Sequence, residues 1–363
     1  MLKINSESKQ IKLRRRILSV CLSLVLILVA FSIAVFATTG DGSFNDSNIK
    51  YIGRWDTPTG STFSNSYWGG AYLRVNFTGT TVKIKLANTT CIAAQIDNGN
   101  FTRYDYVSGT VNLTSKSLSN GTHTLIVAAK YGADELKFQG LVLDPGCTTQ
   151  AAPSKKIIEF IGDSITAGNA AGPKGAYESI SDYAWLTGES LSCDHTQIAY
   201  SGITLSTGYY YSGSPLPGME DAYFKLKPIN YATSTATDYS PDWDFNKYTA
   251  DAVVVNLGTN DAWVNPTVPS STFKSKYTNF LANVRAKYPN AHIFVMKTFG
   301  NYYTTETQDA VTARINAGDT KIHYIDTTGW LTGSNYADGA HPNQRGHQII
   351  TNKLVPILQP YLN

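Results

Sequence analysis

The sequence has few of the residues that bind metal ions or build charged surfaces. Its 363 residues include four cysteines and six histidines, and only 16% of its residues are charged. Outside the first 37 residues the cysteines are Cys91, Cys147 and Cys193, and no histidine stands at zinc-ligand spacing from them. Because a structural zinc site needs four such ligands at short spacings, the sequence predicts no metal site.

The sequence also lacks a basic surface once its first residues are set aside. The formal net charge is +3, but the first 37 residues hold six lysines and arginines and a single acid, Glu7. The remaining chain has 24 basic and 26 acidic residues, a net charge of about −2. Binding of nucleic acid depends on clustered positive charge, so we expect no nucleic-acid partner.

The basic residues at the start belong to a pattern typical of an export signal. They precede an uncharged apolar run over residues 17–37, which ends in Val-Phe-Ala. We interpret residues 1–37 as a signal peptide that is cleaved after Ala37. A run of about 20 apolar residues can also span a bilayer, so an uncleaved signal anchor is the alternative. The protein is therefore expected to be secreted, and to contact a membrane only if the anchor is kept.

The three remaining cysteines are an odd number in an oxidising compartment. Cys91 and Cys147 can form a disulfide within the first domain. Alternatively, the cysteines serve as small buried apolar side chains. The sequence does not decide between these two possibilities.

The segment 48–145 has the pattern of an all-β domain. Residues 82–86 alternate between apolar and polar side chains, residues 122–129 are rich in β-formers, and Asn-Gly pairs punctuate the segment. Short strands with turn signals at this spacing predict a β-sandwich of the jelly-roll kind. Residues 146–155, rich in Gly, Thr and Pro, are the predicted linker.

From residue 156 to residue 363 the pattern changes to alternating strands and helices. Continuous apolar runs predict buried parallel strands, and apolar residues at helical spacing predict helices over 271–288 and 344–358, the latter with Asn343 as N-cap. The predicted strands are 157–161, 252–257, 291–298 and 321–325, with a further one near 197–200. This predicts a doubly wound α/β domain, whose active site lies beyond the carboxyl ends of the strands.

Ser164, Asn260 and His341 all fall at that edge of the predicted sheet. Ser164 ends the Gly-Asp-Ser run after the first strand, and Asp338 precedes His341 by three residues after the last. A serine hydroxyl becomes nucleophilic when an imidazole takes its proton and a carboxylate orients the imidazole. The plain alternative is that Ser164 only caps a following helix.

Two further residues fit the stabilisation of a negatively charged oxygen. Asn260 follows the strand 252–257 and can donate its amide, and Gly202, after the strand near 197–200, can donate a backbone N–H. The alternative for both is that they are ordinary turn residues.

In these blocks the chain resembles the SGNH, or GDSL-type, hydrolase superfamily. Gly-Asp-Ser at 162–164, Gly202, Gly-Thr-Asn-Asp at 258–261 and Asp-Gly-Ala-His-Pro at 338–342 match its first, second, third and fifth blocks in order. The resemblance implies a flavodoxin-like sheet, with Ser164, His341 and Asp338 as catalytic residues. It also implies an oxyanion hole formed by Ser164, Gly202 and Asn260.

The N-terminal β domain, with Gly-Arg-Trp at 53–55 and Trp-Asp-Phe at 243–245, makes the chain most similar to family 2 carbohydrate esterases. This implies removal of O-acetyl groups from polysaccharides such as xylan or glucomannan, with no cofactor. Some members of that family orient the histidine by a backbone carbonyl, which leaves the role of Asp338 open. We expect a monomer.

The long insertion over residues 203–250 and the residues near Asn260 supply aromatic candidates for binding sugar. Trp263, Tyr210 and Trp243 are predicted to form substrate walls, and the alternative is that they pack the insertion onto the domain. Three further polar residues are expected to be structural: Asp163, Asp261 and His347.

Two other functions remain open at this point. One is an esterase of the same fold that acts on lipid or on cell-wall acetyl esters. The other is an inactive exported glycan-binding protein, against which the complete set of blocks argues.

Overall fold

The computed structural model describes residues 40–132, 134–210, 213 and 215–362. The predicted export signal over residues 1–37 lies outside them. In the part of the chain that is described, no helix is long and apolar enough to cross a membrane.

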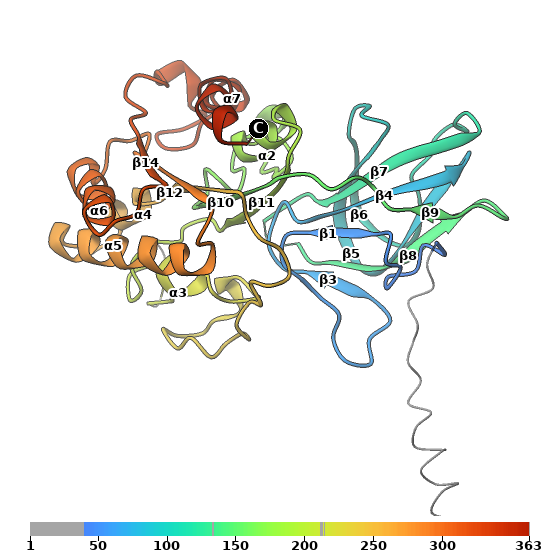
Figure 1. Ribbon diagram of the computed structural model, residues 1–363, viewed down its shortest axis with the longest axis horizontal. Helices are drawn as coiled ribbons and strands as arrows, with labels where there is room; N and C mark the ends of the chain where they lie inside the picture. Colours follow the sequence, from blue (N-terminus) through green and yellow to red (C-terminus); the bar gives the residue numbers. More distant parts are fainter. Residues whose placement is uncertain (1–39, 133, 211–212, 214, 363) are drawn as a thin grey trace, which may run out of the picture. The chain divides into compact units, whose positions relative to one another are not determined.

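An antiparallel sheet forms the first domain (Figure 1). Its path runs β1-β4-β7-β5-β8-β3-β2, with β6 paired to β5 and β9 paired to β4. The strands are β1 Lys50–Ile52, β2 Trp55–Asp56, β3 Ser64–Ser66, β4 Tyr72–Gly79, β5 Val82–Ile96, β6 Thr102–Asn112, β7 Gly121–Ala129, β8 Leu136–Leu143 and β9 Thr149–Gln150.

The long strand β5 makes this sheet continuous and nearly closed. Its first half pairs with β8 and its second half with β7. Along residues 82–86 buried and exposed side chains alternate, as the sequence predicts for a strand with one face in a core. The predicted all-β class of this domain is confirmed. The two layers expected of a sandwich belong to one continuous sheet, because β5 pairs with strands of both.

Part of the predicted linker belongs to this sheet. Strand β9, at residues 149–150, pairs with Asn76 and Phe77 of β4, and Thr149 also accepts a hydrogen bond from the Asn48 side chain. Two polar residues carry no periodicity from which a strand can be predicted, and their pairing partners lie more than 70 residues away.

A parallel five-stranded sheet organises the second domain, with the order β11-β10-β12-β13-β14. This order confirms the doubly wound, flavodoxin-like class. The strands are β10 Ile157–Gly162, β11 Asp194–Ala199, β12 Ala252–Asn256, β13 His292–Met296 and β14 Ile322–Ile325. The helices are η1 Pro173–Gly175, α2 Tyr183–Ser190, α3 Met219–Ala222, η2 Ile229–Tyr231, α4 Thr259–Trp263, α5 Ser270–Lys287, α6 Thr304–Asn316, η3 Gly333–Asn335, α7 Gln344–Leu358 and η4 Gln359–Tyr361.

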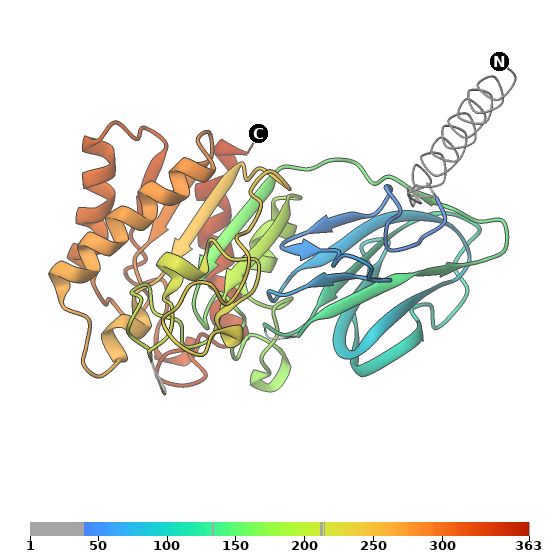
Figure 2. The ribbon, with the colours of Figure 1, turned by 90° about the horizontal axis from the view of Figure 1, so that it is seen from below.

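Helices cover both faces of the parallel sheet (Figures 1 and 2). On one face, α5 and α6 bury side chains such as Phe280 and Val311 against β12 and β13. On the other, α2 and α7 bury Tyr183 and Leu354 in a second cluster. The Asn343 side chain accepts from the Gly346 N–H, so the predicted N-cap of α7 is confirmed.

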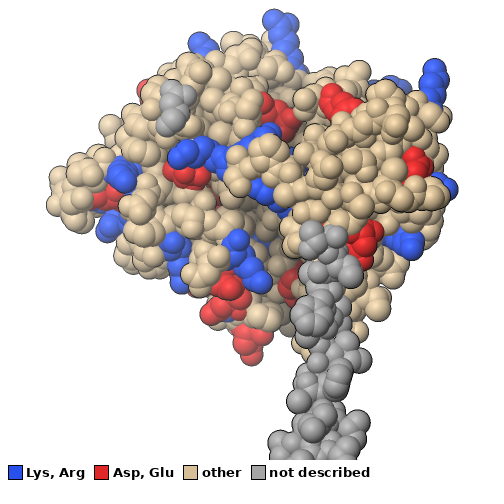
Figure 3. Space-filling view, turned by 45° about the vertical axis from the view of Figure 1, so that its right-hand side comes forward, with Lys and Arg blue, Asp and Glu red and all other residues tan. Residues whose placement is uncertain are grey.

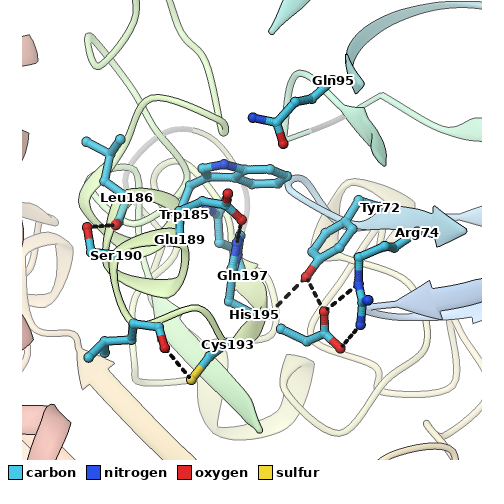
Figure 4. A network of polar contacts seen from close by, with 12 residues as sticks. Tyr72, Arg74, Gln95, Trp185, Leu186, Glu189, Ser190, Cys193, His195 and Gln197 are labelled. Carbon is cyan, nitrogen blue, oxygen red and sulfur yellow. Dashed lines mark hydrogen bonds and ion pairs between the residues drawn. The ribbon is translucent and has the colours of Figure 1, made fainter. Parts of the chain in front are cut away.

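A buried ion pair joins the two domains. The Arg74 guanidinium on β4 binds both carboxylate oxygens of Asp194 on β11, at 3.0 and 2.8 Å, and the two side chains are 3% and 5% exposed. The Tyr72 hydroxyl donates to the same carboxylate at 3.1 Å (Figure 4). Removing two charges from water is costly, so this pair depends on its complete set of hydrogen bonds.

A second junction is formed by Arg54, which is completely buried. Its guanidinium lies 5.0 to 5.7 Å from the ring centres of four aromatic residues and donates to the Lys225 carbonyl oxygen. These rings, on both domains, are Trp68, Tyr223, Trp243 and Phe245. Arg54 therefore ties the insertion over residues 203–250 to the β-strand domain.

Cys91, Cys147 and Cys193 are all free thiols. The disulfide alternative is therefore wrong for Cys91 and Cys147. Cys91 and Cys193 are 2% and 4% exposed, as expected for small apolar side chains in a core.

Candidate active site

Ser164 and His341 meet at the carboxyl edge of the parallel sheet. Ser164 lies two residues after the end of β10, and His341 lies between β14 and α7. The Ser164 Oγ is 2.9 Å from Nε2 of His341, although the two residues are 177 positions apart. The predicted pair is therefore within hydrogen-bonding distance.

Ser164 does not cap a helix. The residues that follow it form consecutive turns, and the Asn169 N–H donates to the Ser164 carbonyl oxygen at 2.9 Å. The neighbouring Asp163 is buried and accepts from the Ile165 N–H at 3.0 Å, which supports its expected structural role. Burial outweighs this hydrogen bond and raises the pKa of Asp163 to about 6.

Asp338 uses its two carboxylate oxygens for two purposes. Oδ1 accepts from the N–H groups of Ala340 and His341, both at 2.8 Å, and so holds the loop in a tight turn. Oδ2 lies 2.8 Å from Nδ1 of His341. Burial raises the pKa of Asp338, but these hydrogen bonds outweigh it and lower the pKa to about 2. The carboxylate is therefore ionised throughout the pH range in which an imidazole gains or loses a proton. Because Oδ2 accepts from Nδ1, the single proton of the neutral imidazole stays on Nδ1.

The three residues predicted to form the oxyanion hole, Ser164, Gly202 and Asn260, line the same cavity. The backbone N–H groups of Ser164 and Gly202 have no acceptor among the described residues, so both are available to a ligand. Gly202 has φ of +80°, a conformation that favours glycine. The Asn260 amide, 8% exposed, donates one N–H to the Ile203 carbonyl oxygen at 2.9 Å and has a second N–H.

The short helix α4 presents Asn260 to the cavity. Its N-cap, Gly258, has φ of +122°, and a Cβ there would lie 3.0 Å from the Phe273 ring. Asp261 on α4 accepts from the N–H groups of Leu205 and Ser206 at 2.8 and 3.1 Å, which supports its expected structural role. Burial raises the pKa of Asp261 to about 6.

The sequence reasoning missed Asn169. Its Nδ2 lies 3.2 Å from Nε2 of His341, and the side chain lines the same cavity as Ser164. Its only sequence signal is its place five residues after Ser164, in a run with no strand or helix pattern. A polar side chain at that position can reach the imidazole only because the turns fold the chain back.

The cavity at Ser164 is small, with a volume of about 270 Å³. Trp263 and Tyr210 both line it, as predicted. Trp263 is 40% exposed, and its ring contacts Tyr302 edge to face at 6.1 Å. An indole held in this way presents a surface to solvent beside the reacting groups.

Trp243, the third aromatic residue predicted to bind substrate, does not line this cavity. Trp243 is 6% exposed and packs in the core with Tyr223 and Leu226 of the same insertion. Its ring also contacts Tyr248 at 5.8 Å and the Arg54 guanidinium. Trp243 therefore packs the insertion onto the domain, where an indole buries a large apolar area.

His347 has the expected packing role. It is completely buried in α7, stacks on Tyr183 at 6.2 Å and accepts from the Tyr183 N–H at 3.1 Å. Burial lowers the pKa of His347 to about 3, so its imidazole is neutral at ordinary pH. Among the described residues there is no group of three His, Cys, Asp or Glu side chains spaced to hold a metal ion.

Comparison with known families agrees with this geometry. Residues 160–349, which include Ser164, Asn260 and His341, match the GDSL-like lipase/acylhydrolase family. The chain belongs to the GDSL-like lipase/acylhydrolase family. In addition, residues 51–153 match the N-terminal domain of family 2 carbohydrate esterases, so this GDSL-like chain combines both domains that the sequence predicts.

Relatives of this GDSL-like chain include known esterases. A cellulase/esterase of Acetivibrio thermocellus is 29% identical over 85% of this chain, which spans 39% of that protein. An acetylxylan esterase/glucomannan deacetylase of Cellvibrio japonicus is 23% identical over 84% of this chain and 88% of its own length.

A solved structure shows the same architecture. The family two carbohydrate esterase from Clostridium thermocellum, solved in complex with cellohexaose, is 28% identical, with a TM-score of 0.73. The superposition covers 86% of this chain and 99% of that one. The GDSL-like chain therefore has the two-domain fold of the family 2 carbohydrate esterases.

Proposed function

We propose that the protein is an exported serine esterase that removes O-acetyl groups from polysaccharides such as acetylated xylan or glucomannan. The observation that carries this proposal is the chain of contacts from Ser164 Oγ through His341 to Asp338, in a cavity of about 270 Å³. The names of the related esterases point to the same class of substrate.

In the acylation step, Ser164 Oγ attacks the acetyl carbonyl carbon while Nε2 of His341 takes the hydroxyl proton. The ionised Asp338 stabilises the imidazolium that forms. The negative oxygen of the tetrahedral intermediate accepts from the N–H groups of Ser164 and Gly202 and from the Asn260 amide. The bond to the sugar oxygen then breaks, His341 returns its proton to that oxygen, and acetyl-Ser164 remains.

In the deacylation step, water takes the place of the sugar hydroxyl. Nε2 of His341 accepts a proton from the water as its oxygen attacks the acetyl carbon of acetyl-Ser164. The same donors hold the negative oxygen. Collapse of the intermediate returns the proton to Ser164 Oγ and releases acetate. The two steps together consume only the ester and water.

The size of the cavity favours a short acyl group. Sites for drug-sized ligands measure about 300 to 1,000 Å³, and this cavity lies just below that range. Of the large apolar side chains that are exposed in the described residues, Tyr106, Trp263, Ile315 and Tyr361, only Trp263 lines it. A broad apolar surface for lipid is therefore not part of the described site.

The rim of the cavity fits a sugar bearing the acetyl group. Trp263 and Tyr210 place aromatic rings beside Ser164, and the flat apolar face of a sugar can lie against such rings. On the face drawn in Figure 3, basic and acidic side chains are interspersed.

The test is release of acetate from acetylated xylan and acetylated glucomannan, together with hydrolysis of 4-nitrophenyl esters of increasing acyl length. We expect activity on the acetyl ester and little on the octanoyl ester, and a loss of at least about a thousandfold in kcat in Ser164→Ala. Ser275→Ala, an exposed serine of α5, is the matched control. Full activity of Ser164→Ala would overturn the mechanism, whereas preference for long acyl chains would overturn only the substrate.

Export is tested separately by mass spectrometry of the protein recovered from the culture medium. A mature N-terminus at residue 38 supports cleavage after Ala37. Full-length protein in the membrane fraction supports the signal anchor instead, and full-length protein in the cytoplasm contradicts both.

A further inference from the structure

A second cavity, with a volume of about 500 Å³, lies between the β-strand domain and the insertion over residues 203–250. Tyr51, Trp55 and Asp56 line it from the β-strand domain. Trp243, Lys247 and Tyr248 line it from the insertion. Its volume falls within the range of about 300 to 1,000 Å³ found for small-molecule sites.

Each wall of this cavity carries a pair of aromatic rings. Tyr51 and Trp55 are 4.8 Å apart between ring centres, and Trp243 and Tyr248 are 5.8 Å apart. The Tyr51 hydroxyl donates to the Phe44 carbonyl oxygen, and the Trp55 indole donates to the Ile52 carbonyl oxygen, so both rings are held in place. Fixed aromatic surfaces of this kind lose little entropy when a ligand packs on them.

Polar groups that can make further hydrogen bonds are present in the same walls. The Lys247 side chain is exposed, and its ammonium makes no ion pair or hydrogen bond to a described residue. One oxygen of Asp56 accepts from the Tyr67 hydroxyl at 3.1 Å, and its second oxygen has no described partner. The Trp243 indole N–H, in a side chain that is 6% exposed, also lacks a described acceptor.

This combination suits a neutral ligand with many hydroxyl groups. A hydroxyl can accept from Lys247 and donate to Asp56, whereas a strongly charged ligand of either sign would meet one of these groups as a like charge. Aromatic rings beside such groups fit the alternating polar and apolar surfaces of a sugar ring.

The second cavity is separate from the one at Ser164. Lys247 and Tyr248 precede the first residue of β12, Ala252, whereas Asn260 follows its last residue, Asn256. At about 3.3 Å per residue, strand β12 alone separates the two ends by about 15 Å. A ligand in the second cavity therefore leaves Ser164 free to react.

We propose that this cavity is a second saccharide-binding site, which holds an unacetylated segment of the polysaccharide chain. The inference rests on the proposed function for the identity of the polymer. Two binding sites on one protein molecule raise the effective concentration of the polymer at Ser164. A substrate too small to reach both sites gains no affinity from the second one.

The test uses full-length protein carrying Ser164→Ala, so that binding is measured without turnover. Xylohexaose and cellohexaose are titrated calorimetrically into this protein and into versions that also carry Lys247→Ala or Asp56→Asn. Each of these two substitutions should lower the affinity of one of the two sites about tenfold, because each removes a hydrogen bond between the sugar and a charged group. Tyr106→Ala, which removes an aromatic ring that is 80% exposed on β6, is the control and leaves binding unchanged.

A kinetic measurement keeps this inference apart from the proposed function. With Ser164 intact, Lys247→Ala should hydrolyse 4-nitrophenyl acetate at the reference rate and show a raised KM only for acetylated polymer. If the reference protein releases no acetate from any polysaccharide, the proposed function fails, but the titrations still decide the second site. Absence of oligosaccharide binding, or binding that neither Lys247→Ala nor Asp56→Asn weakens, overturns the inference.

Discussion

The Asn169 side-chain nitrogen lies 3.2 Å from Nε2 of His341, the same nitrogen that lies 2.9 Å from Ser164 Oγ. With Nδ1 protonated toward Asp338, Nε2 has a single lone pair, for which both donors compete. Once Nε2 takes a proton it can no longer accept from Asn169. Asn169 therefore contacts the nitrogen that takes the proton of Ser164.

Asn169→Ala should lower kcat on 4-nitrophenyl acetate about fivefold, because it removes one neutral hydrogen bond of about 1 kcal/mol to the imidazole. Asn169→Asp should be at least as slow, because a carboxylate cannot donate to Nε2. The exposed Asn352→Ala on α7 is the control and should keep the reference kcat. An unchanged kcat in both Asn169 variants contradicts the role.

Asp338→Ala should lose less activity than Ser164→Ala. A buried carboxylate in this position is worth about 10⁴ in kcat, but the Asp338 side chain is 56% exposed, so water can partly replace it. We expect a loss of about ten- to a hundredfold, measured as kcat on 4-nitrophenyl acetate. A loss as large as that of Ser164→Ala would mean that Asp338 is indispensable. No loss would mean that another group orients His341.

Asn260→Ala should lower kcat by about a hundred- to a thousandfold, as removal of one oxyanion donor does. Because the amide is used mainly in the transition state, KM on 4-nitrophenyl acetate should change little. Asn260→Asp is the companion variant, since a carboxylate would repel the oxyanion and should be at least as slow. A fall in kcat accompanied by a rise in KM of the same factor would indicate a general disturbance of α4 instead.

Asp163 should make stability depend on pH. The pKa of Asp163 is raised from 3.8 to about 6 in the folded protein. The protonated carboxyl therefore contributes fully to the free energy of unfolding below pH 3.8, and this contribution is lost as the pH rises through 6. A rise of this size corresponds to about 3 kcal/mol. In Asp163→Asn this part of the dependence disappears. Denaturant unfolding at pH 4, 5, 6 and 7 should show the reference protein losing stability relative to the variant, and a constant difference would refute the assignment.

Arg74→Met should destabilise the protein by about 3 to 5 kcal/mol, because it leaves the Asp194 carboxylate buried without its ion pair. The same change at Lys274, whose pair with Asp309 is about half exposed, should cost less than about 1 kcal/mol. Adding Asp194→Leu to Arg74→Met should recover part of the loss. Denaturant unfolding measures all three, and equal effects at Arg74 and Lys274 would contradict the importance of the buried pair.

Most of the fold could be predicted because its signals are local. Alternation along residues 82–86 reports one buried face, continuous apolar runs report strands covered on both sides, and Asn343 before a periodic segment reports the start of α7. Strand β9 escaped prediction, since two residues carry no periodicity of their own. The sequence also left the positions of the aromatic residues in the insertion open. Tyr210 lies at the catalytic cavity and Trp243 is buried, yet both stand in a polar stretch without strand or helix periodicity.

The amino-acid sequence by itself determined the two domains, the order of the strands along the chain, and which hydroxyl, imidazole, carboxylate and amide stand at the ends of strands. Only the tertiary structure decided that Asn169 reaches His341 across 172 positions and that Arg54 binds the insertion to the β-strand domain. It also decided that a second cavity opens between the two domains. Periodicity and capping reflect energies within a few residues of chain, whereas these contacts depend on how distant surfaces pack, which no short stretch of sequence encodes.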